Sequence, residues 1–344
     1  MARKPAGPNH HASEVVWSAR PPVKTAGAAG FTAARSEATS TAPAHRPTAM
    51  PPETDLASLR AEIDRIDDRL VDLLVERVAV VGRIAAAKGD RERGGLALRP
   101  AREAVILRRL VARAGGRLPA TTLVRMWREL LATTTRLQTP LSIAVWAPPE
   151  AAGVWDVARD QYGSTTPAER APSAVAALDR VSEGAARIAV LPMPEEDRDW
   201  WPALLEPARR RLAVIARLPF VEGSGPAALA LAPLEPEPSQ DDLSLLVLEA
   251  EPEVDRTLLA EPLGRAGLEP SWRALARTDG RVLHLVEVRG FHGLHEPFPT
   301  ALFGALGGRL RRATVLGAYP RPIAADGLRS AADAAGPRTS SEKA

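Results

Sequence analysis

Apolar side chains return every three or four residues between positions 55 and 88, the spacing of one face of an amphipathic helix. The positions are Leu56, Leu59, Ile63, Ile66, Leu70, Leu73, Val80, Val81 and Ile84. Thr54 or Asp55 can cap the start of this helix, and Gly89 can end it. The pattern predicts a helix of about 35 residues, roughly 50 Å long. One small domain cannot cover so long an apolar face, so we expect a partner along its length.

Two shorter helices follow in the pattern. One is predicted over residues 100–114, because Pro100 suits a first helical turn and Gly115 breaks the run. The other is predicted over residues 119–138, where Pro140 prevents continuation. This part of the chain therefore predicts an all-α domain of three helices.

Beyond residue 140 the pattern becomes that of an α/β fold. Short apolar runs predict strands at 143–147, 188–191, 212–216, 245–248, 282–288 and 314–317. Helical stretches alternate with them at 168–184 and 254–267. The proline-rich segment 233–239 indicates a linker between two small subdomains.

These changes divide the chain into five parts. Residues 1–52 are rich in Ala, Pro, Thr, Ser and Gly without an apolar period, so we expect a disordered extension. We expect a helical domain over residues 53–140, a small α/β lobe over 141–232 and an α+β domain over 240–322. Residues 323–344 are expected to form a disordered tail.

Composition narrows the function classes. The chain of 344 residues has no cysteine, which removes disulfides, thiol nucleophiles and thiolate metal sites. The sequence pI is about 9.6, but the net charge is only +3 and acids alternate with bases, so we expect no nucleic-acid partner. No apolar run reaches the roughly 20 residues of a membrane span, and no secretory signal pattern is present. We therefore expect a cytoplasmic protein that does not bind membranes.

Two cations interrupt the apolar stripe of the long predicted helix. Arg77 and Lys88 are 11 residues apart, an angular offset of about 20°, so both point to the apolar side. Charge on that side is costly unless it is paired or meets an anion. A structural ion pair or a snorkelling head group would explain either residue alone. The two together favour an anion site.

The shorter helices add four polar candidates. Thr134 and Gln138 are four residues apart and share one face of the third predicted helix. Gln is a neutral donor suited to an oxygen that gains charge, although it could also be a polar helix terminus beside Pro140. Arg102 and Glu103 stand in the first turn of the second helix, where a glutamate ordinarily complements the helix dipole.

Together these residues closely resemble the all-helical chorismate mutases. The matching positions are Leu59, Arg60, Ile63, Asp64, Ile66, Asp67, Leu70, Leu73, Leu74, Glu76, Arg77, Lys88, Arg99, Pro100, Arg102, Glu103, Thr134 and Gln138. The resemblance implies a homodimer of intertwined helices with two shared active sites, which would cover the long first helix. It implies the Claisen rearrangement of chorismate to prephenate in Phe and Tyr biosynthesis, without a covalent intermediate, metal or cofactor.

The resemblance also implies a role for each matched polar side chain. Arg77 would bind a substrate carboxylate, and Lys88 would bind a carboxylate and the ether oxygen. Gln138 would donate to the same ether oxygen, and Thr134, where many relatives carry Ser, would contact a carboxylate. Lys88, Gln138 and Arg77 are thus the expected catalytic residues. Because position 138 is Gln and not Glu, we expect no need for acid pH.

Three further residues would complete substrate binding. Glu103 would hold the ring hydroxyl, with Arg102 supporting nearby. Arg60 would reach the other protomer's site, because it lies about 25 Å from Arg77 along one helix and one substrate cannot touch both. The connection from Lys88 to Arg102 is longer and more basic than in compact relatives, which puts the position of the hydroxyl contact in doubt.

The second half resembles parts of another enzyme. Residues 141–193, especially 185–192, resemble the first lobe of a prephenate dehydratase, and residues 241–320 resemble the small ACT regulatory domain. Where that family carries a catalytic Thr-Arg-Phe, residues 210–212 are Arg-Arg-Leu, and most of the second lobe is missing. The resemblance therefore implies a degenerate dehydratase half that serves dimerisation or docking.

Three alternatives stay open. The chain could be a bifunctional mutase and dehydratase, a catalytically silent regulatory subunit, or a lyase acting on isochorismate. A silent subunit is expected to lack Arg77, Lys88 or Gln138, and all three are present. His292 and His295 suggest a metal site only weakly, because two histidines in a glycine-rich loop are more often solvated, so we expect no metal.

Overall fold

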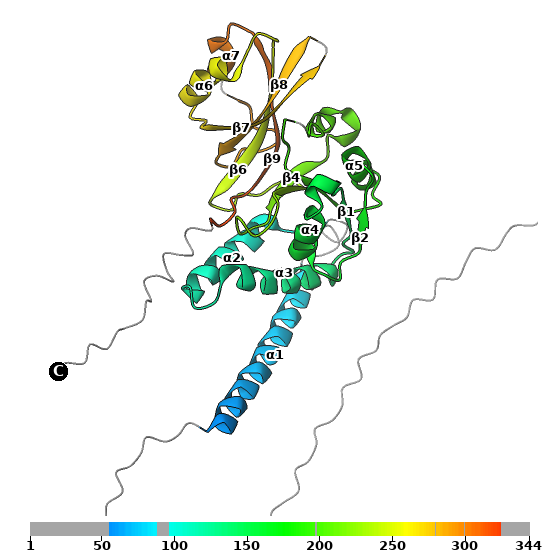
Figure 1. The fold of residues 1–344 in the computed structure, drawn as a ribbon, viewed down its shortest axis with the longest axis vertical. Coiled ribbons are helices and arrows are strands. Elements are labelled where there is room, and N and C mark those ends of the chain that lie inside the picture. Colours follow the sequence, from blue (N-terminus) through cyan, green and yellow to red (C-terminus); the bar gives the residue numbers. More distant parts are fainter. Residues whose placement is uncertain (1–54, 88–95, 197, 279, 299, 325–344) are drawn as a thin grey trace, which may run out of the picture. The chain divides into compact units, whose positions relative to one another are not determined.

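Figure 1 shows the fold of the chain in a computed structural model. The structure describes residues 55–87, 96–196, 198–278, 280–298 and 300–324. The chain divides into two compact units, residues 1–62 and 63–344, and each is described by itself. Helix α1 (Leu56–Ala87) contributes its first turns to one unit and its remainder to the other.

Helix α1 is one continuous helix of 32 residues, as the apolar period predicts. Asp55 caps it, because its Oδ1 accepts the backbone N–H of Ala57 at 3.3 Å. No residue of α1 is buried, and its leucines and isoleucines are exposed by 42% to 59%. The described residues therefore leave the apolar face of α1 uncovered. Gly89, the predicted end of the helix, lies outside the described residues.

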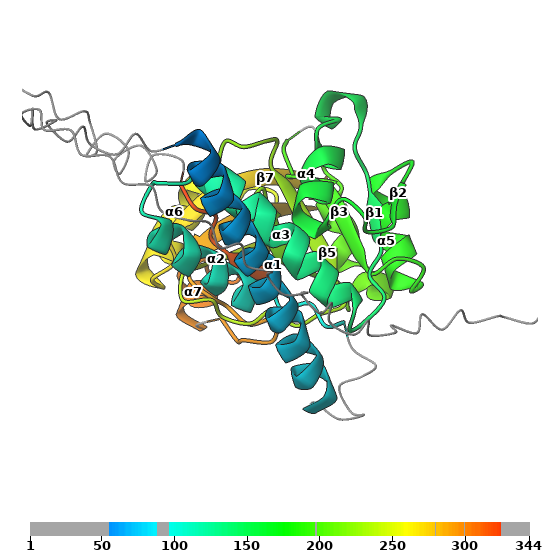
Figure 2. The same ribbon diagram turned by 90° about the horizontal axis from the view of Figure 1, so that it is seen from below.

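Two shorter helices, α2 (Pro100–Ala114) and α3 (Ala120–Arg136), pack against each other. A proline begins α2 at its predicted position. Gly115 ends it with φ 56°, and its N–H donates to the carbonyl of Val111. Figure 2 shows α3 between α2 and α4 (Val154–Tyr162), so α3 joins the helical part to the α/β part.

The α/β part is built on one sheet of nine strands in the order β2-β1-β3-β5-β4-β9-β6-β8-β7. The strands are β1 (Ile143–Val145), β2 (Ala168–Arg170), β3 (Ile188–Pro192), β4 (Ala213–Leu218), β5 (Ala228–Ala232), β6 (Asp242–Ala250), β7 (Pro270–Thr278), β8 (Arg281–Arg289) and β9 (Leu310–Pro320). β1 pairs in parallel with β2 and β3, and β5 lies antiparallel between β3 and β4. The strands β9, β6, β8 and β7 are antiparallel neighbours.

The two halves of this sheet meet where β4 and β9 pair in parallel at Val214 and Gly317. A Cβ added at Gly317 would lie 2.1 Å from the carbonyl oxygen of Val214, so a side chain cannot be accommodated there. The predicted linker 233–239 contains no strand and connects β5 to β6. The two lobes are therefore joined both by this backbone pairing and by the linker.

Helices pack on both halves of the sheet. Helices α4 and α5 (Ala174–Ser182) contact β1 and β3, and helix α6 (Arg256–Arg265) contacts β7 and α7 (Thr300–Ala305). Fully buried aliphatic side chains of the central strands, such as Leu191 and Leu231, form the core between sheet and helices. The predicted combination of an all-α part, an α/β lobe and an antiparallel α+β part is confirmed.

The prediction of one helix over residues 168–184 is wrong. This segment begins with β2, and α5 starts only after Ser173, whose Oγ accepts the N–H of Ala176 at 3.1 Å. The strands β5 and β7 were not predicted. The expected disordered segment 1–52 lies outside the described residues. In the expected tail, Ile323 donates its N–H to the carbonyl of Phe220 at 2.8 Å, and residues 325–344 lie outside the described part.

Candidate active site

Two of the predicted site residues lie at the end of α3, Thr134 in its last turn and Gln138 in the turn that follows the helix. Thr134 is buried, and its hydroxyl donates to the carbonyls of Leu130 and Leu131 at 3.0 Å. Gln138 is half-buried, and its Nε2 donates to the carbonyl of Thr134 at 3.0 Å. Both side chains therefore donate to backbone carbonyls at the C-terminal end of the helix. The Gln138 amide can exchange this one bond for a ligand oxygen at small cost, because water or a ligand can replace it.

Arg77 on α1 carries a partly buried positive charge. Its Nη1 is buried, and within the described residues that atom has no hydrogen-bond partner. Burial lowers the pKa of the Arg77 guanidinium, because desolvation penalises its charged form. An arginine nevertheless stays protonated at neutral pH. An unpaired, partly desolvated guanidinium is stabilised by a carboxylate, so Arg77 retains the character of an anion ligand.

Glu103 on α2 is buried and forms an ion pair with Arg128 on α3. Nη1 of Arg128 donates to Oε2 of Glu103 at 2.5 Å, and their side chains are 5% and 11% exposed. Burial raises the pKa of the Glu103 carboxyl, and the charge of Arg128 opposes that rise. The short distance and the good geometry support a charged pair. Arg128 thus occupies one oxygen of a carboxylate that is predicted to hold a substrate hydroxyl.

Arg128 also contacts the α/β part. Its guanidinium lies over the ring of Phe220, 5.3 Å from the centroid, in the loop after β4. The hydroxyl of Tyr162, at the end of α4, is buried, and it has no hydrogen bond within the described residues. Burial and the nearby charge of Glu103 raise the pKa of Tyr162, so this phenol stays neutral. The ion pair therefore lies at the junction of α2, α3 and the α/β part.

The remaining predicted residues differ in accessibility. Arg102 is exposed, although its neighbour Glu103 is buried, because successive helical residues point to different faces. Arg60 is exposed on the first turns of α1. Lys88 lies outside the described residues. The structure thus places Thr134 and Gln138 one turn apart. It does not gather the other described site residues into one pocket with them.

Arg128 was not predicted as a site residue. It lies four residues after Val124 and three before Leu131, both of which are buried on the inner face of α3. A charge at such an apolar position is the same signal that identified Arg77 and Lys88. Applying that criterion to α3 would have found Arg128, but its partner Glu103 required the packing of α2.

In the second half, the run at 210–212 lies immediately before β4. Arg210 and Arg211 are exposed and Leu212 is buried. Elsewhere in this half, Glu287 on β8 is buried and accepts hydrogen bonds from Arg273 and Tyr319. These contacts lie within the antiparallel half of the sheet, so they stabilise the fold and offer no open catalytic group.

No group of three or more His, Asp or Glu side chains among the described residues is arranged to hold a metal ion. No helix in the described ranges is long and apolar enough to cross a membrane.

The helical part of the chain is similar to a known protein family. Residues 59–139 match the chorismate mutase type II family. Over 96 residues the chain is 31% identical to a bifunctional chorismate mutase/prephenate dehydratase of Stutzerimonas stutzeri, covering 27% of this chain and 26% of that protein. Over 151 residues it is 28% identical to the protein of the same description from Pseudomonas aeruginosa, covering 42% of this chain and 40% of that protein. The chain thus spans less than half the length of these relatives.

Among solved structures, the chain is similar to a prephenate dehydratase from Streptococcus mutans. The match covers 53% of this chain and 99% of that one, with 12% sequence identity and a TM-score of 0.36. The predicted resemblance of residues 59–139 to the chorismate mutases is confirmed by the family match.

Proposed function

We propose that this chain is a chorismate mutase that converts chorismate to prephenate in the cytoplasm, in the biosynthesis of Phe and Tyr. The observation that carries the proposal is the match of residues 59–139 to the type II mutase family, which includes every polar residue predicted for the site. The half-buried, unpaired Nη1 of Arg77 supports it, because a dianionic substrate would supply the missing partner.

In the proposed mechanism, two effects contribute to catalysis. Arg77, Lys88 and Thr134 hold the two carboxylates so that the ends of the rearranging system are close together, which is an effect of proximity and orientation. Lys88 and Gln138 donate to the ether oxygen as it gains negative charge, which is preorganised electrostatic stabilisation. The rearrangement is intramolecular, so bonds break and form within the substrate without a nucleophile from the chain.

The Glu103–Arg128 pair fits a role in holding the ring hydroxyl. Arg128 bonds to Oε2 of Glu103, and the backbone of Arg99 also bonds to this carboxylate. A carboxylate can accept more than two hydrogen bonds, so Glu103 can also accept one from the substrate, while Arg128 fixes its orientation. A neutral Glu103 would be a weaker acceptor, so keeping it charged through Arg128 favours this contact.

We further propose that the active unit is a homodimer with two shared sites. The bare face of α1, with leucines and isoleucines 42% to 59% exposed, would be covered by α1 of the second copy. In this arrangement Arg60 would contribute to the partner's site. An exposed apolar stripe along 32 residues is otherwise a liability for a monomer in water.

The test is chorismate consumption by the purified chain, followed by ultraviolet absorbance. Lys88→Ala and Gln138→Ala are each expected to lower kcat by roughly 10²–10³, because each removes one donor to the ether oxygen. Arg83→Ala removes an exposed cation of α1 and is the matched control, with unchanged activity. Because Gln138 needs no proton, kcat should stay level between pH 6 and 8. A folded dimer that leaves chorismate untouched would refute the proposal and favour a silent regulatory subunit.

A second candidate is a bifunctional chorismate mutase and prephenate dehydratase, which is the description that the relatives carry. It requires a dehydratase site in the second half, where the run at 210–212 lacks the family's Thr. Incubating the purified chain with prephenate and measuring phenylpyruvate separates the two. We expect no phenylpyruvate beyond the uncatalysed rate, and a clear excess would establish the second activity.

A further inference from the structure

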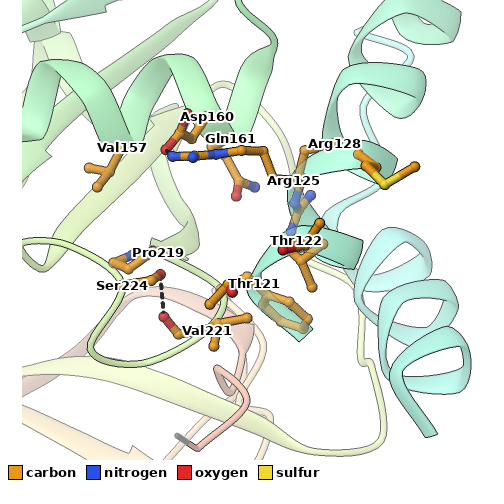
Figure 3. Close-up of a pocket in the computed structure, with 13 residues that line it drawn as sticks. Thr121, Thr122, Arg125, Arg128, Val157, Asp160, Gln161, Pro219, Val221 and Ser224 are labelled. Atoms are coloured by element: carbon orange, nitrogen blue, oxygen red, sulfur yellow. Dashed lines mark hydrogen bonds and ion pairs between the residues drawn. The ribbon is translucent and has the colours of Figure 1, made fainter. Parts of the chain in front are cut away.

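A cavity of about 370 Å³ lies between α3, α4 and the loop that joins β4 to β5. Figure 3 shows the side chains around it. It is lined by the first turns of α3, whereas Thr134 and Gln138 lie at and just beyond the other end of that helix and do not line it. The cavity is therefore separate from the predicted mutase residues, although Arg128, the ion-pair partner of Glu103, forms part of its wall.

One wall of the cavity carries a buried amide without a partner. Gln161 on α4 is 8% exposed, and within the described residues its side chain makes no hydrogen bond. Figure 3 shows its amide pointing into the cavity. The amide atoms of Gln161 are accessible from the cavity, so a hydrogen-bonding molecule there can pair with them. The hydroxyls of Thr121 and Thr122 line the same space and add donors.

Guanidinium donors at the cavity wall suit a carboxylate. Two arginines, Arg125 and Arg128, line the cavity against a single carboxylate, that of Asp160. Asp160 is engaged by Arg125 at the rim, and Arg128 uses Nη1 for Glu103. The second terminal nitrogen of Arg128 has no hydrogen-bond partner within the described residues. Each arginine thus has one carboxylate partner, and a ligand carboxylate would be held by the remaining guanidinium donors of Arg128.

The remaining wall is apolar. Val157, Phe220 and Val221 are all buried and line the inner side of the cavity. Its volume lies near the lower end of the range for small-molecule sites, which excludes large ligands. We propose that this cavity is a binding site for a compact carboxylate with a branched apolar body, held by Gln161 and Arg128 and packed against Phe220.

The test is calorimetric titration of the full chain with three probes. 3-Methylbutanoate has both the negative charge and the branched apolar group. 3-Methylbutanamide has the branched apolar group without the charge, and inorganic phosphate has negative charge without the apolar group. We expect one molecule of 3-methylbutanoate to bind per chain, and neither of the other probes. Comparable binding of the amide, or no heat from the carboxylate at millimolar concentration, would overturn the proposal.

Variants locate the probe. Gln161→Leu is expected to weaken 3-methylbutanoate binding about tenfold, because it removes a hydrogen bond to a charged group. Gln161→Glu should abolish it by adding a like charge. Arg187→Gln, which removes an exposed arginine of the same lobe outside the cavity, should leave it unchanged. A probe that instead bound at Arg77 would ignore both changes at Gln161, and that result would refute the location. Thermal unfolding of each variant checks that it is folded.

Because the ligand and Glu103 share Arg128, an occupied cavity should also loosen the hold on Glu103. This step rests on the proposed function. Saturating 3-methylbutanoate is expected to raise KM for chorismate in the unsubstituted chain and to leave it unchanged in Gln161→Leu. An equal rise in both would mean that the probe competes at the mutase site, which would overturn the link. The calorimetric result does not depend on mutase activity, so the two failures are distinguishable.

Discussion

Replacing Glu103 by Gln tests whether the ion pair at the junction of α2 and α3 is buried in solution. The side chains of Glu103 and Arg128 are 11% and 5% exposed and 2.5 Å apart. Glu103→Gln would leave the Arg128 guanidinium buried opposite a neutral amide. Removing one partner of a buried pair typically costs about 3–5 kcal/mol, and the low exposure here leaves little solvent to reduce that value. We therefore expect the free energy of unfolding to fall by about that amount.

The assay is urea unfolding followed by circular dichroism, with the free energy obtained by linear extrapolation. Protein concentration is held constant, because dimerisation would contribute to the apparent stability. A double variant, Glu103→Leu with Arg128→Met, removes both charges and retains an apolar contact to Phe220. It should be equal to the unsubstituted chain or more stable by about 1–4 kcal/mol, because it avoids the desolvation of two ions.

The exposed pair of Glu261 and Arg265 on α6 provides the control, with side chains 72% and 69% exposed. Glu261→Gln should change the free energy of unfolding by less than about 0.5 kcal/mol. A loss of under about 1 kcal/mol for Glu103→Gln, similar to that control, would refute the burial of the pair. The proposed fixing of Glu103 by Arg128 would then also be refuted.

Two further perturbations probe other parts of the fold. Gly317→Ala places a Cβ 2.1 Å from the carbonyl oxygen of Val214, so the sheet junction must shift, and we expect a loss of about 1–3 kcal/mol in urea unfolding; Gly264→Ala in α6, with open space around its Cβ, should not lose stability. Burial lowers the pKa of His284, whose Nε2 bonds to the carbonyl of Val254 at 2.9 Å. Below about pH 6.5 the unfolded chain therefore binds more protons than the folded one, and stability should fall as pH drops, by up to about 1.4 kcal/mol per pH unit. His284→Gln should flatten that slope in unfolding curves measured from pH 7.5 to 5.5, and a slope that persists in the variant would contradict the assignment.

The sequence predicted the helices better than the strands. The limits of α2 follow from local chemistry, because a proline begins the helix and Gly115 ends it in the left-handed conformation. The strand β5 was missed because three of its five residues are alanine, which has low strand propensity, and it is a strand only because β3 and β4 flank it. The strand β2 has three residues and no apolar period. Such strands are determined by tertiary pairing, which local patterns do not contain.

For the candidate site, the sequence predicted individual residues but not their contacts with one another. The sequence identified Glu103 by resemblance, but the ion pair with Arg128 depends on how α2 packs against α3. Arg77 was identified because it interrupts an apolar stripe, and the structure leaves its Nη1 buried without a partner among the described residues. Its expected partners, a substrate and a second chain, are not encoded by the local pattern of one chain. The arrangement of residues between two subunits could therefore not be predicted from the sequence pattern alone.

The contacts of α2 give a physical reason for the second half of the chain. Arg108, two turns from the end of α2, donates to the carbonyls of Ser239, Asp241 and Arg321 at distances between 2.7 and 3.0 Å. These carbonyls lie where β6 begins and just after β9 ends, so the guanidinium ties α2 to both strands of the antiparallel half. Arg128 ties α3 to the loop after β4 in the same way, through Phe220.

Both anchors act on α2 and α3, and helix α1 has no buried residue. The second half therefore fixes two of the three helices and leaves the apolar face of the third available for another chain. A mutase domain held in this way gains rigidity at Glu103 from contacts outside its own helices. On this argument a dehydratase-like lobe without the family's Thr still has a function, because α2 and α3 would lose their anchors without it.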